Sequence, residues 1–215
     1  MNTRKTLLLG LFALTALSTS RPLAAQEPKP LDASALDALD AEPVAPLLRG
    51  LKPRGGERTE KSREYRTSND ATARSGASGG AKERGMLFIT YSDNTVEERP
   101  LVEIPLLFEV NSDQLKGSQS EANLRLLAEK LKSLAADGIQ VSIEGHASAE
   151  GAVERNLELS KQRAEAIHFR LRELGVNPAL LRSAKGYGSA YAAHPASAPE
   201  AHRELDRRVL VVRER

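Results

Sequence analysis

The chain contains no cysteine and no tryptophan, and aromatic residues make up only 4% of its 215 residues. The absence of cysteine excludes disulfide bonds, cysteine nucleophiles and cysteine-based zinc sites. With so few aromatic side chains, platforms on which bases or sugars stack are not expected. The 31 Lys and Arg residues nearly balance the 29 Asp and Glu, and a net charge of +2 does not predict a nucleic-acid-binding protein. The four histidines are scattered along the chain, so neither a metal site nor a cofactor is expected.

The length allows one ordinary domain with appendages, and a hydrophobic fraction of 40% is low for a chain that folds from end to end. Residues 1–25 predict a secretory signal peptide. Arg4 and Lys5 form its positively charged start, and the apolar run Thr6–Leu17 is too short to span a membrane. Small residues around Ala25 offer a cleavage point, and an uncleaved anchor or a buried helix is the alternative. Export of this kind leads to the periplasm in a Gram-negative cell.

Residues 26–85 predict a disordered, charged linker. Ala, Pro and acidic residues dominate its first third, and Arg49–Arg84 carries more Lys and Arg than Asp and Glu. This composition offers too few large apolar side chains to offset the entropy lost on ordering. The basic stretch leaves open a contact with anionic lipid or a wall polymer. A short partner-binding helix is another alternative, carried by four leucines: Leu36, Leu39, Leu47 and Leu48.

From residue 86 onwards the pattern is that of a folded domain, 86–215, with its core at about 101–212. Apolar residues at every second position predict strands, and steps of three and four predict helices. Ser118 and Glu121 fit a capping box at a helix start, and Pro105 makes its strand an edge strand or splits it. In chain order, we expect a strand at 86–91, a strand at 101–110, a helix at 118–136, a strand at 139–143, a helix at 156–174, a strand reaching 187 and a strand at 208–212.

This order of strand, helix, strand, helix, strand and strand predicts an α/β fold. Helices between strands imply crossover connections and parallel pairing, to which an antiparallel strand is added. The expected product is a two-layer sandwich with two main helices on one face of a mixed sheet. In the last strand, Val209 and Val211 point to one side and Leu210 and Val212 to the other, which predicts a strand covered on both faces.

One polar flank of the second helix is a candidate ligand site. Asn156 and Arg163 are seven residues apart, so they lie within about 20° of each other around the helix axis. The guanidinium of Arg163 matches a carboxylate, and the helix N-terminus offers unpaired amide donors. Glu144 and Glu150 could supply negative charge for an ammonium group, which predicts a receptor for a zwitterionic amino acid. Two simpler interpretations stay open. Asn156 is only an N-cap, or Arg163 pairs on the surface with Glu158, Glu165 or a helix-end carbonyl, a contact worth under about 1 kcal/mol.

Five short motifs follow one another along the chain: "LLFEVNSDQL", "VSIEGHASAEG", "NLELSKQRAEAI", "GYG" and "DRRV". In this order and at this spacing they resemble the OmpA-like peptidoglycan-binding domain. That family is shared by outer-membrane proteins, peptidoglycan-associated lipoproteins and flagellar motor stator proteins. The resemblance runs from about Leu101 to Val212, roughly half of the chain. It implies the OmpA-like βαβαββ fold.

The resemblance also implies that the domain holds peptidoglycan non-covalently, through the diaminopimelate of the stem peptide. In the family, an acidic side chain in the loop after the second strand takes the ammonium group, and an Arg in the following helix takes the carboxylate. Here Ser148 stands where the acid is expected, and losing that charge would weaken binding roughly ten- to a hundredfold unless Glu150 restores it. The ligand-binding residues that the resemblance implies are Arg163, Asn156, Ser148, Glu150, Glu109, Asn111 and Arg207, with Arg208 as the alternative to Arg207.

The expected function is that of a non-enzymatic peptidoglycan-binding protein, associated with the cell wall in the periplasm; a position at the outer membrane stays open. The alternative is an OmpA-like interaction scaffold in an envelope complex, with weakened or lost peptidoglycan binding, which Ser148 favours. A wall hydrolase would need two carboxylates across a cleft, and nothing in the sequence fixes such a geometry for Glu109, Glu144 and Glu150. An envelope protein reached through residues 26–85 is the expected second partner.

Overall fold

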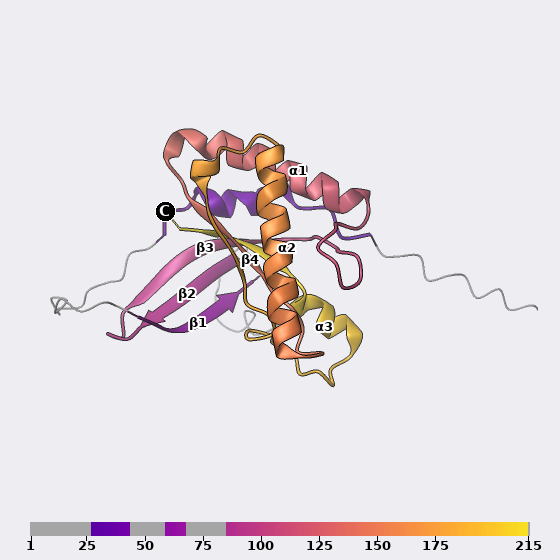
Figure 1. Cartoon of the computed structure of the whole chain (residues 1–215). Helices are drawn as coiled ribbons and strands as arrows, with labels where there is room; N and C mark the ends of the chain where they lie inside the picture. The colour runs from indigo at the N-terminus through magenta and orange to yellow at the C-terminus, as the bar shows by residue number, and fades with distance from the viewer. Residues whose placement is uncertain (1–26, 44–58, 68–84, 215) are drawn as a thin grey trace, which may run out of the picture.

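The computed structural model describes residues 27–43, 59–67 and 85–214 (Figure 1). The predicted signal peptide, residues 1–25, lies outside the described residues. Among the helices that are described, none has both the length and the apolar character needed to cross a membrane.

Six strands form one mixed sheet. They are β1 (Glu60–Arg66), β2 (Gly85–Tyr91), β3 (Val96–Ile104), β4 (Val141–Gly145), β5 (Leu181–Gly186) and β6 (Val209–Arg213). Their order across the sheet is β1-β2-β3-β6-β4-β5. β4 and β5 pair in parallel, and every other neighbouring pair in this sheet is antiparallel. The parallel pair is adjacent because a helix carries the chain back between the two strands, as a crossover connection requires.

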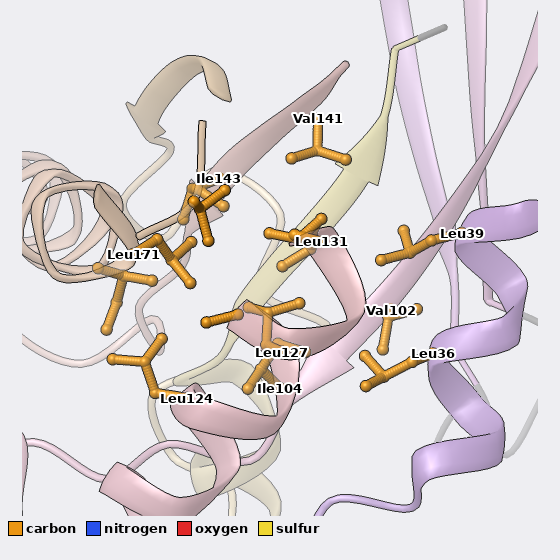
Figure 2. Close-up of a cluster of buried hydrophobic side chains, with 14 of the residues drawn as sticks. Leu36, Leu39, Val102, Ile104, Leu124, Leu127, Leu131, Val141, Ile143 and Leu171 are labelled. Carbon is orange, nitrogen blue, oxygen red and sulfur yellow. The ribbon is translucent and has the colours of Figure 1, made fainter. Parts of the chain in front are cut away.

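The two long helices and three 3₁₀ helices pack on one face of the sheet and form the main core with it, to which the short helix at 200–206 contributes no residue. The long ones are α1 (Ser118–Ser133) and α2 (Val153–Glu173); the shorter ones are α3 (Glu200–Asp206) and the 3₁₀ helices η1 (Ala33–Asp40), η3 (Leu134–Asp137) and η4 (Pro178–Leu180). Leu124, Leu127 and Leu131 form the buried stripe of α1, and they share this core with Val141 and Ile143 of β4 (Figure 2). The predicted α/β sandwich, with two main helices on one face of a mixed sheet, is therefore confirmed. The expectation of mainly parallel pairing is wrong, because in this sheet only β4 and β5 pair in parallel.

β6 contributes to two separate cores because its side chains alternate between the faces of the sheet. Val209 and Val211 lie in the main core, whereas Leu210 and Val212 lie in a smaller one on the opposite face. The smaller core also contains Leu87, Ile89 and Leu101, with Tyr65 and Tyr91 packed against it. The prediction that this strand is covered on both faces is confirmed.

Several predicted element boundaries were wrong. The strand expected at 101–110 begins at Val96 and ends at Ile104, because Pro105 has no N–H to continue the ladder. The capping box at Ser118 does not form: Gly117 is the N-cap of α1, at φ 80°. The carboxylate of Glu27 instead accepts a hydrogen bond from the N–H of Gln119 in the first turn, at 3.3 Å. α2 begins three residues earlier than expected, at Val153 with Ala152 as its N-cap. The short helix α3 was not predicted.

The first described segment, residues 27–43, is structured, which corrects the prediction of a linker throughout 26–85. Asp32 caps η1 by accepting a hydrogen bond from the N–H of Ser34. Leu36 and Leu39 of η1 are fully buried in the main core, where Figure 2 shows them directed towards α1 and β3. The helix considered for partner binding thus packs on the chain's own domain; its other two leucines, Leu47 and Leu48, lie outside the described residues.

The second described segment, residues 59–67, is also structured and supplies β1 at one edge of the sheet. The sheet curves far enough for β1 to reach the face of β4: Arg63 bonds Glu144, and the ring of Tyr65 lies 5.0 Å from that of His146. The strand was missed because its sequence, "EKSREYR", is polar at almost every position. Its inward-facing Arg63 and Tyr65 bond Glu144 of β4, and Tyr65 also packs against the smaller core.

Candidate functional site

The loop between β3 and α1 folds back on itself beside the helices. Phe108 and Leu115 form an isolated antiparallel bridge. The N–H of Glu109 donates to the carbonyl of Gln114 at 2.9 Å, and the N–H of Lys116 donates to that of Leu107 at 2.8 Å. These bonds give the tip of the loop, residues 109–114, a defined shape.

Arg163 of α2 reaches this loop. Its Nε donates to the carbonyl oxygen of Ser112 at 3.0 Å, and its guanidinium lies 4.7 Å from the centre of the Phe108 ring. Burial and the nearby charge of Arg207 lower the pKa of Arg163, while the carboxylate of Asp113 acts in the opposite direction. The guanidinium stays protonated at any physiological pH. A half-buried cation held on an aromatic ring is well placed to bind an anion.

The terminal nitrogens of Arg163 are available to a ligand. Within the described part of the chain they form neither a hydrogen bond nor an ion pair. They are also not fully buried, because every buried side-chain nitrogen or oxygen that lacks a partner belongs to His146 or Arg208 in that part of the chain. Within the described residues, Arg163 therefore forms no ion pair with Glu158 or Glu165, and its hydrogen-bond partner is the Ser112 carbonyl.

Asn156 supports the neighbouring loop, residues 146–151. Its Nδ2 donates to the carbonyls of Ser148, at 3.1 Å, and Glu150, at 2.8 Å. Since α2 begins before it, Asn156 is not the N-cap of this helix. Both hydrogen bonds of its Nδ2 go to this loop, so the side chain of Asn156 attaches residues 148–150 to the first turn of α2.

Two glycines let the loops at the ends of β4 and β5 lie directly on α2. A Cβ on Gly145 would overlap the carbonyl of Ser160, and a Cβ on Gly186 would overlap the backbone of Lys161. The Oγ of Ser160 accepts a hydrogen bond from the N–H of Gly188 at 2.8 Å. The "GYG" turn is thus a place of close backbone approach, which brings the loops after β4 and β5 to one side of α2.

The remaining predicted site residues differ in their surroundings. Ser148 is buried, with 5% of its surface exposed. Glu150 is exposed and lies 3.4 Å from Arg203 of α3. Arg207 bonds Glu200 at 2.5 Å and lies close enough to Arg163 to affect the pKa of that residue. These contacts connect α3 to the loop at 146–151 and to Arg163.

Glu109 and Asn111 belong to the loop that Arg163 contacts. The carboxylate of Glu109 is exposed, 4.0 Å from the ammonium of Lys116. Asn111 is exposed and adopts φ 54°, a left-handed conformation that asparagine tolerates better than most residues. This places Asn111 at the turn of the loop, one residue before the carbonyl that Arg163 binds.

Glu144 lies on the opposite face of the sheet, so it does not belong with Arg163 as the sequence predicted. Its carboxylate accepts hydrogen bonds from Arg63, at 2.6 Å, and from the hydroxyl of Tyr65, at 2.9 Å. The ring of His146 stacks on that of Tyr187 at 5.5 Å, and neither of its nitrogens has a hydrogen-bond partner among the described residues, although Nε2 lies 3.9 Å from the Glu144 carboxylate. Burial, with the charges of Arg208 and Arg63, lowers the pKa of His146 to about 3. Arg208, the alternative to Arg207, points to this far-face cluster, 6.0 Å from the ring of Tyr65.

Sequence reasoning missed the residues that join these sites across the fold. Arg63 and Tyr65 sit at alternate positions of β1, a two-residue period that signals inward-facing side chains in a polar strand. Ser112 and Asp113 lie inside the matched motif "LLFEVNSDQL", but no spacing indicated that they lie beside Arg163. Among the described residues, no group of three His, Cys, Asp or Glu side chains could hold a metal ion.

Three of the solved structures that match this chain are the following. The peptidoglycan-associated lipoprotein from Burkholderia pseudomallei is 29% identical over 51% of this chain and 88% of that chain, with a TM-score of 0.45. The periplasmic domain of Helicobacter pylori MotB is 24% identical over 54% of this chain and 81% of that chain, with a TM-score of 0.47. The OmpA-like domain of FopA1 from Francisella tularensis is 18% identical over 54% of this chain and 71% of that chain, with a TM-score of 0.42.

A search of curated proteins found no match. The model of the OmpA family, by contrast, matches residues 107–205. The matched segment contains the loop that Arg163 contacts, all of α1 and α2, and the loops after β4 and β5. The resemblance to the OmpA-like domain that the motifs predicted is thus confirmed over residues 107–205.

Proposed function

We propose that this chain is a non-enzymatic protein of the cell envelope that binds peptidoglycan non-covalently through its OmpA-family domain. The match between residues 107–205 and the model of the OmpA family supports peptidoglycan as the ligand. One observation supports the site: the guanidinium of Arg163 is held by the Ser112 carbonyl and the Phe108 ring, while its terminal nitrogens stay unpaired within the described residues. Such a fork can accept a carboxylate through two parallel hydrogen bonds.

The proposed ligand is the diaminopimelate of the stem peptide, whose side chain ends in both a carboxylate and an ammonium group. Arg163 would bind the carboxylate, and Arg207 would add positive potential beside it. Asn156 would hold the loop at 146–151 through the carbonyls of Ser148 and Glu150. The buried hydroxyl of Ser148 carries no charge, so the carboxylate that receives the ammonium group must come from another residue.

A hydrolase is a weaker candidate. Glu144 is ion-paired with Arg63 on the opposite face of the sheet, so it shares no cleft with Glu150 or Glu109. Two carboxylates facing one bond are what glycoside hydrolysis requires.

The proposed location is the periplasm, where a secreted chain meets the cell wall; a position at the outer membrane remains part of the proposal. A second, protein partner in the envelope is also proposed. Leu36 and Leu39 do not form the contact with this partner, because both are buried in the chain's own core. An interaction scaffold with little affinity for the wall is the alternative function, and Ser148 in place of an acid favours it.

Co-sedimentation of the full chain with purified diaminopimelate-type sacculi tests the proposal. We expect Arg163→Ala to lower the affinity about ten- to a hundredfold, as the loss of a charge-assisted hydrogen bond predicts. Arg172→Ala is the matched control, because Arg172 is an exposed residue at the other end of the same helix. If Arg163→Ala sediments with the sacculi as the wild type does, while its thermal unfolding is unchanged, the proposed site is wrong and the scaffold function is favoured.

A further inference from the structure

A ligand with both a carboxylate and an ammonium group needs a negative side chain near Arg163. Three of the glutamates singled out from the sequence are poorly suited. Glu144 is buried on the far face and paired with Arg63. Glu150 lies 3.4 Å from Arg203, and Glu109 lies 4.0 Å from Lys116, so each already has a cationic neighbour.

Asp113 combines proximity to Arg163 with the absence of a cationic partner. It directly follows Ser112, whose carbonyl accepts the hydrogen bond from the Nε of Arg163 at 3.0 Å. Asp113 itself is exposed, and within the described segments its carboxylate forms neither an ion pair nor a hydrogen bond. Its charge is therefore free to act on a ligand that Arg163 holds.

The backbone on both sides of Asp113 is held in place. The Oγ of Ser112 accepts a hydrogen bond from the N–H of Gln114 at 3.0 Å. The carbonyl of Gln114 accepts one from the N–H of Glu109 at 2.9 Å. Asp113 thus projects from a turn that is closed on itself and attached to α2 through Arg163, and it needs little ordering when a ligand binds.

We infer that Asp113 is the residue that binds the ammonium group of the ligand, beside the carboxylate held by Arg163. This inference rests on the proposed function and names a residue that takes over the task for which Ser148 has no charge. The two groups form no direct ion pair, so neither must be pulled from the other when the ligand enters. The charge of Asp113 also opposes the lowering of the pKa of Arg163, which agrees with their closeness.

The test is a titration of the full chain with two soluble stem peptides. One contains free diaminopimelate, and the other is the same peptide with the distal amine acetylated, which removes the positive charge and keeps the carboxylate. The wild type should prefer the free amine by about ten- to a hundredfold, the strength of a charge-assisted contact. In Asp113→Asn that preference should disappear, because binding of the acetylated peptide through Arg163 does not require Asp113.

Three further variants separate the possible outcomes. Asp137→Asn is the matched control, since Asp137 is an exposed aspartate at the end of η3 and should leave the preference unchanged. If Asp113→Asn keeps the preference for the free amine, or if Glu150→Gln abolishes it instead, the role of Asp113 is overturned. Arg163→Ala tests the site as a whole. If this variant loses binding to both peptides, the proposed function is supported, even when the results for Asp113→Asn overturn the role of Asp113. Unchanged binding of both peptides to Arg163→Ala would reject the proposed function as well.

Discussion

Glu144 carries a carboxylate into the far face of the sheet, where only 1% of its side chain is exposed. Arg63, itself 5% exposed, and the hydroxyl of Tyr65 satisfy it. Burial by itself lowers the pKa of Arg63. The charge of Glu144 and the hydrogen bond to Glu60 act in the opposite direction, and the net effect is a raised pKa. A buried pair of this kind contributes little compared with an apolar pair, yet removing one member leaves an uncompensated charge.

Replacing Arg63 with leucine should therefore destabilise the protein strongly. We expect Arg63→Leu to lower the free energy of unfolding by about 3–5 kcal/mol, and the double variant Arg63→Leu/Glu144→Leu to lose less than the single one. Urea denaturation of the two variants measures the difference. Arg66→Leu on the same strand is the control: its pair with Glu64 is more than half exposed, so it should change stability by less than about 1 kcal/mol. A double variant that is less stable than Arg63→Leu would contradict a buried ion pair.

His146 makes the stability of the protein depend on pH. The pKa of His146 is lowered from 6.5 to about 3 in the folded protein. Between about pH 3 and 6.5, the His146 side chain therefore binds a proton more readily in the unfolded chain than in the folded one. The stability is therefore complete above about pH 6.5 and falls as the pH drops towards 3, by about 1.4 kcal/mol for each unit of pKa difference once the pH is below both values. The titratable and charged groups around it are Arg63, Arg208, Glu144, Tyr65, Tyr187 and Tyr191.

The measurement is urea denaturation from pH 7 down to 5, a range in which most carboxylates stay ionised. The wild type should lose stability across it, and His146→Gln should show a flatter dependence. His202→Gln, at an exposed position of α3, should follow the wild type. Equal slopes for the wild type and His146→Gln would mean that His146 is not the responsible group.

At the scale of elements, η1 shows how a segment outside the family match becomes part of the core. The N–H of Leu31 and the carbonyl of Lys29 both bond the side chain of Asn123 on α1. The carbonyl of Leu39 accepts from Arg213 of β6 at 2.8 Å, and Lys130 of α1 pairs with Asp37 and Asp40. Contacts from two directions thus attach η1 to both layers of the fold.

Leu39→Ala tests whether η1 is attached in solution. Leu39 has no exposed surface, so its truncation should lower the free energy of unfolding by about 2–5 kcal/mol. Thermal or urea unfolding measures this, with Leu205→Ala as the control because Leu205 is 39% exposed. Should Leu39→Ala be as stable as the control, residues 27–43 would act as the linker that the composition predicted.

At the scale of the whole molecule, the curvature of the sheet determines what each face does. The helices cover one face, and β1 covers part of the other by reaching Glu144 and the ring of His146. Three segments meet at α2: the loop at 105–117, the loop at 146–151 and α3. In Figure 1, α3 lies beside the lower end of α2. The candidate site therefore uses residues from loops that are separated along the chain but share one helix.

The sequence by itself determined the features that depend on neighbours along the chain. The leucine stripe of α1 and the two-sided β6 each follow from local periodicity. The motifs around Arg163 likewise indicated the family, because they recur within short segments in a recognisable order. These are properties of a few consecutive residues, and they need no knowledge of the fold.

Only the tertiary structure decided which polar residues face one another. It separated Glu144 from Arg163 by the thickness of the sheet, and it brought the Ser112–Asp113 turn to Arg163. It also placed a polar strand, β1, over a buried carboxylate, although its composition is that of a solvated segment. The physical reason is that ion pairs and hydrogen bonds act at contact distance, and contacts between residues some 50 to 80 positions apart arise only when the chain folds.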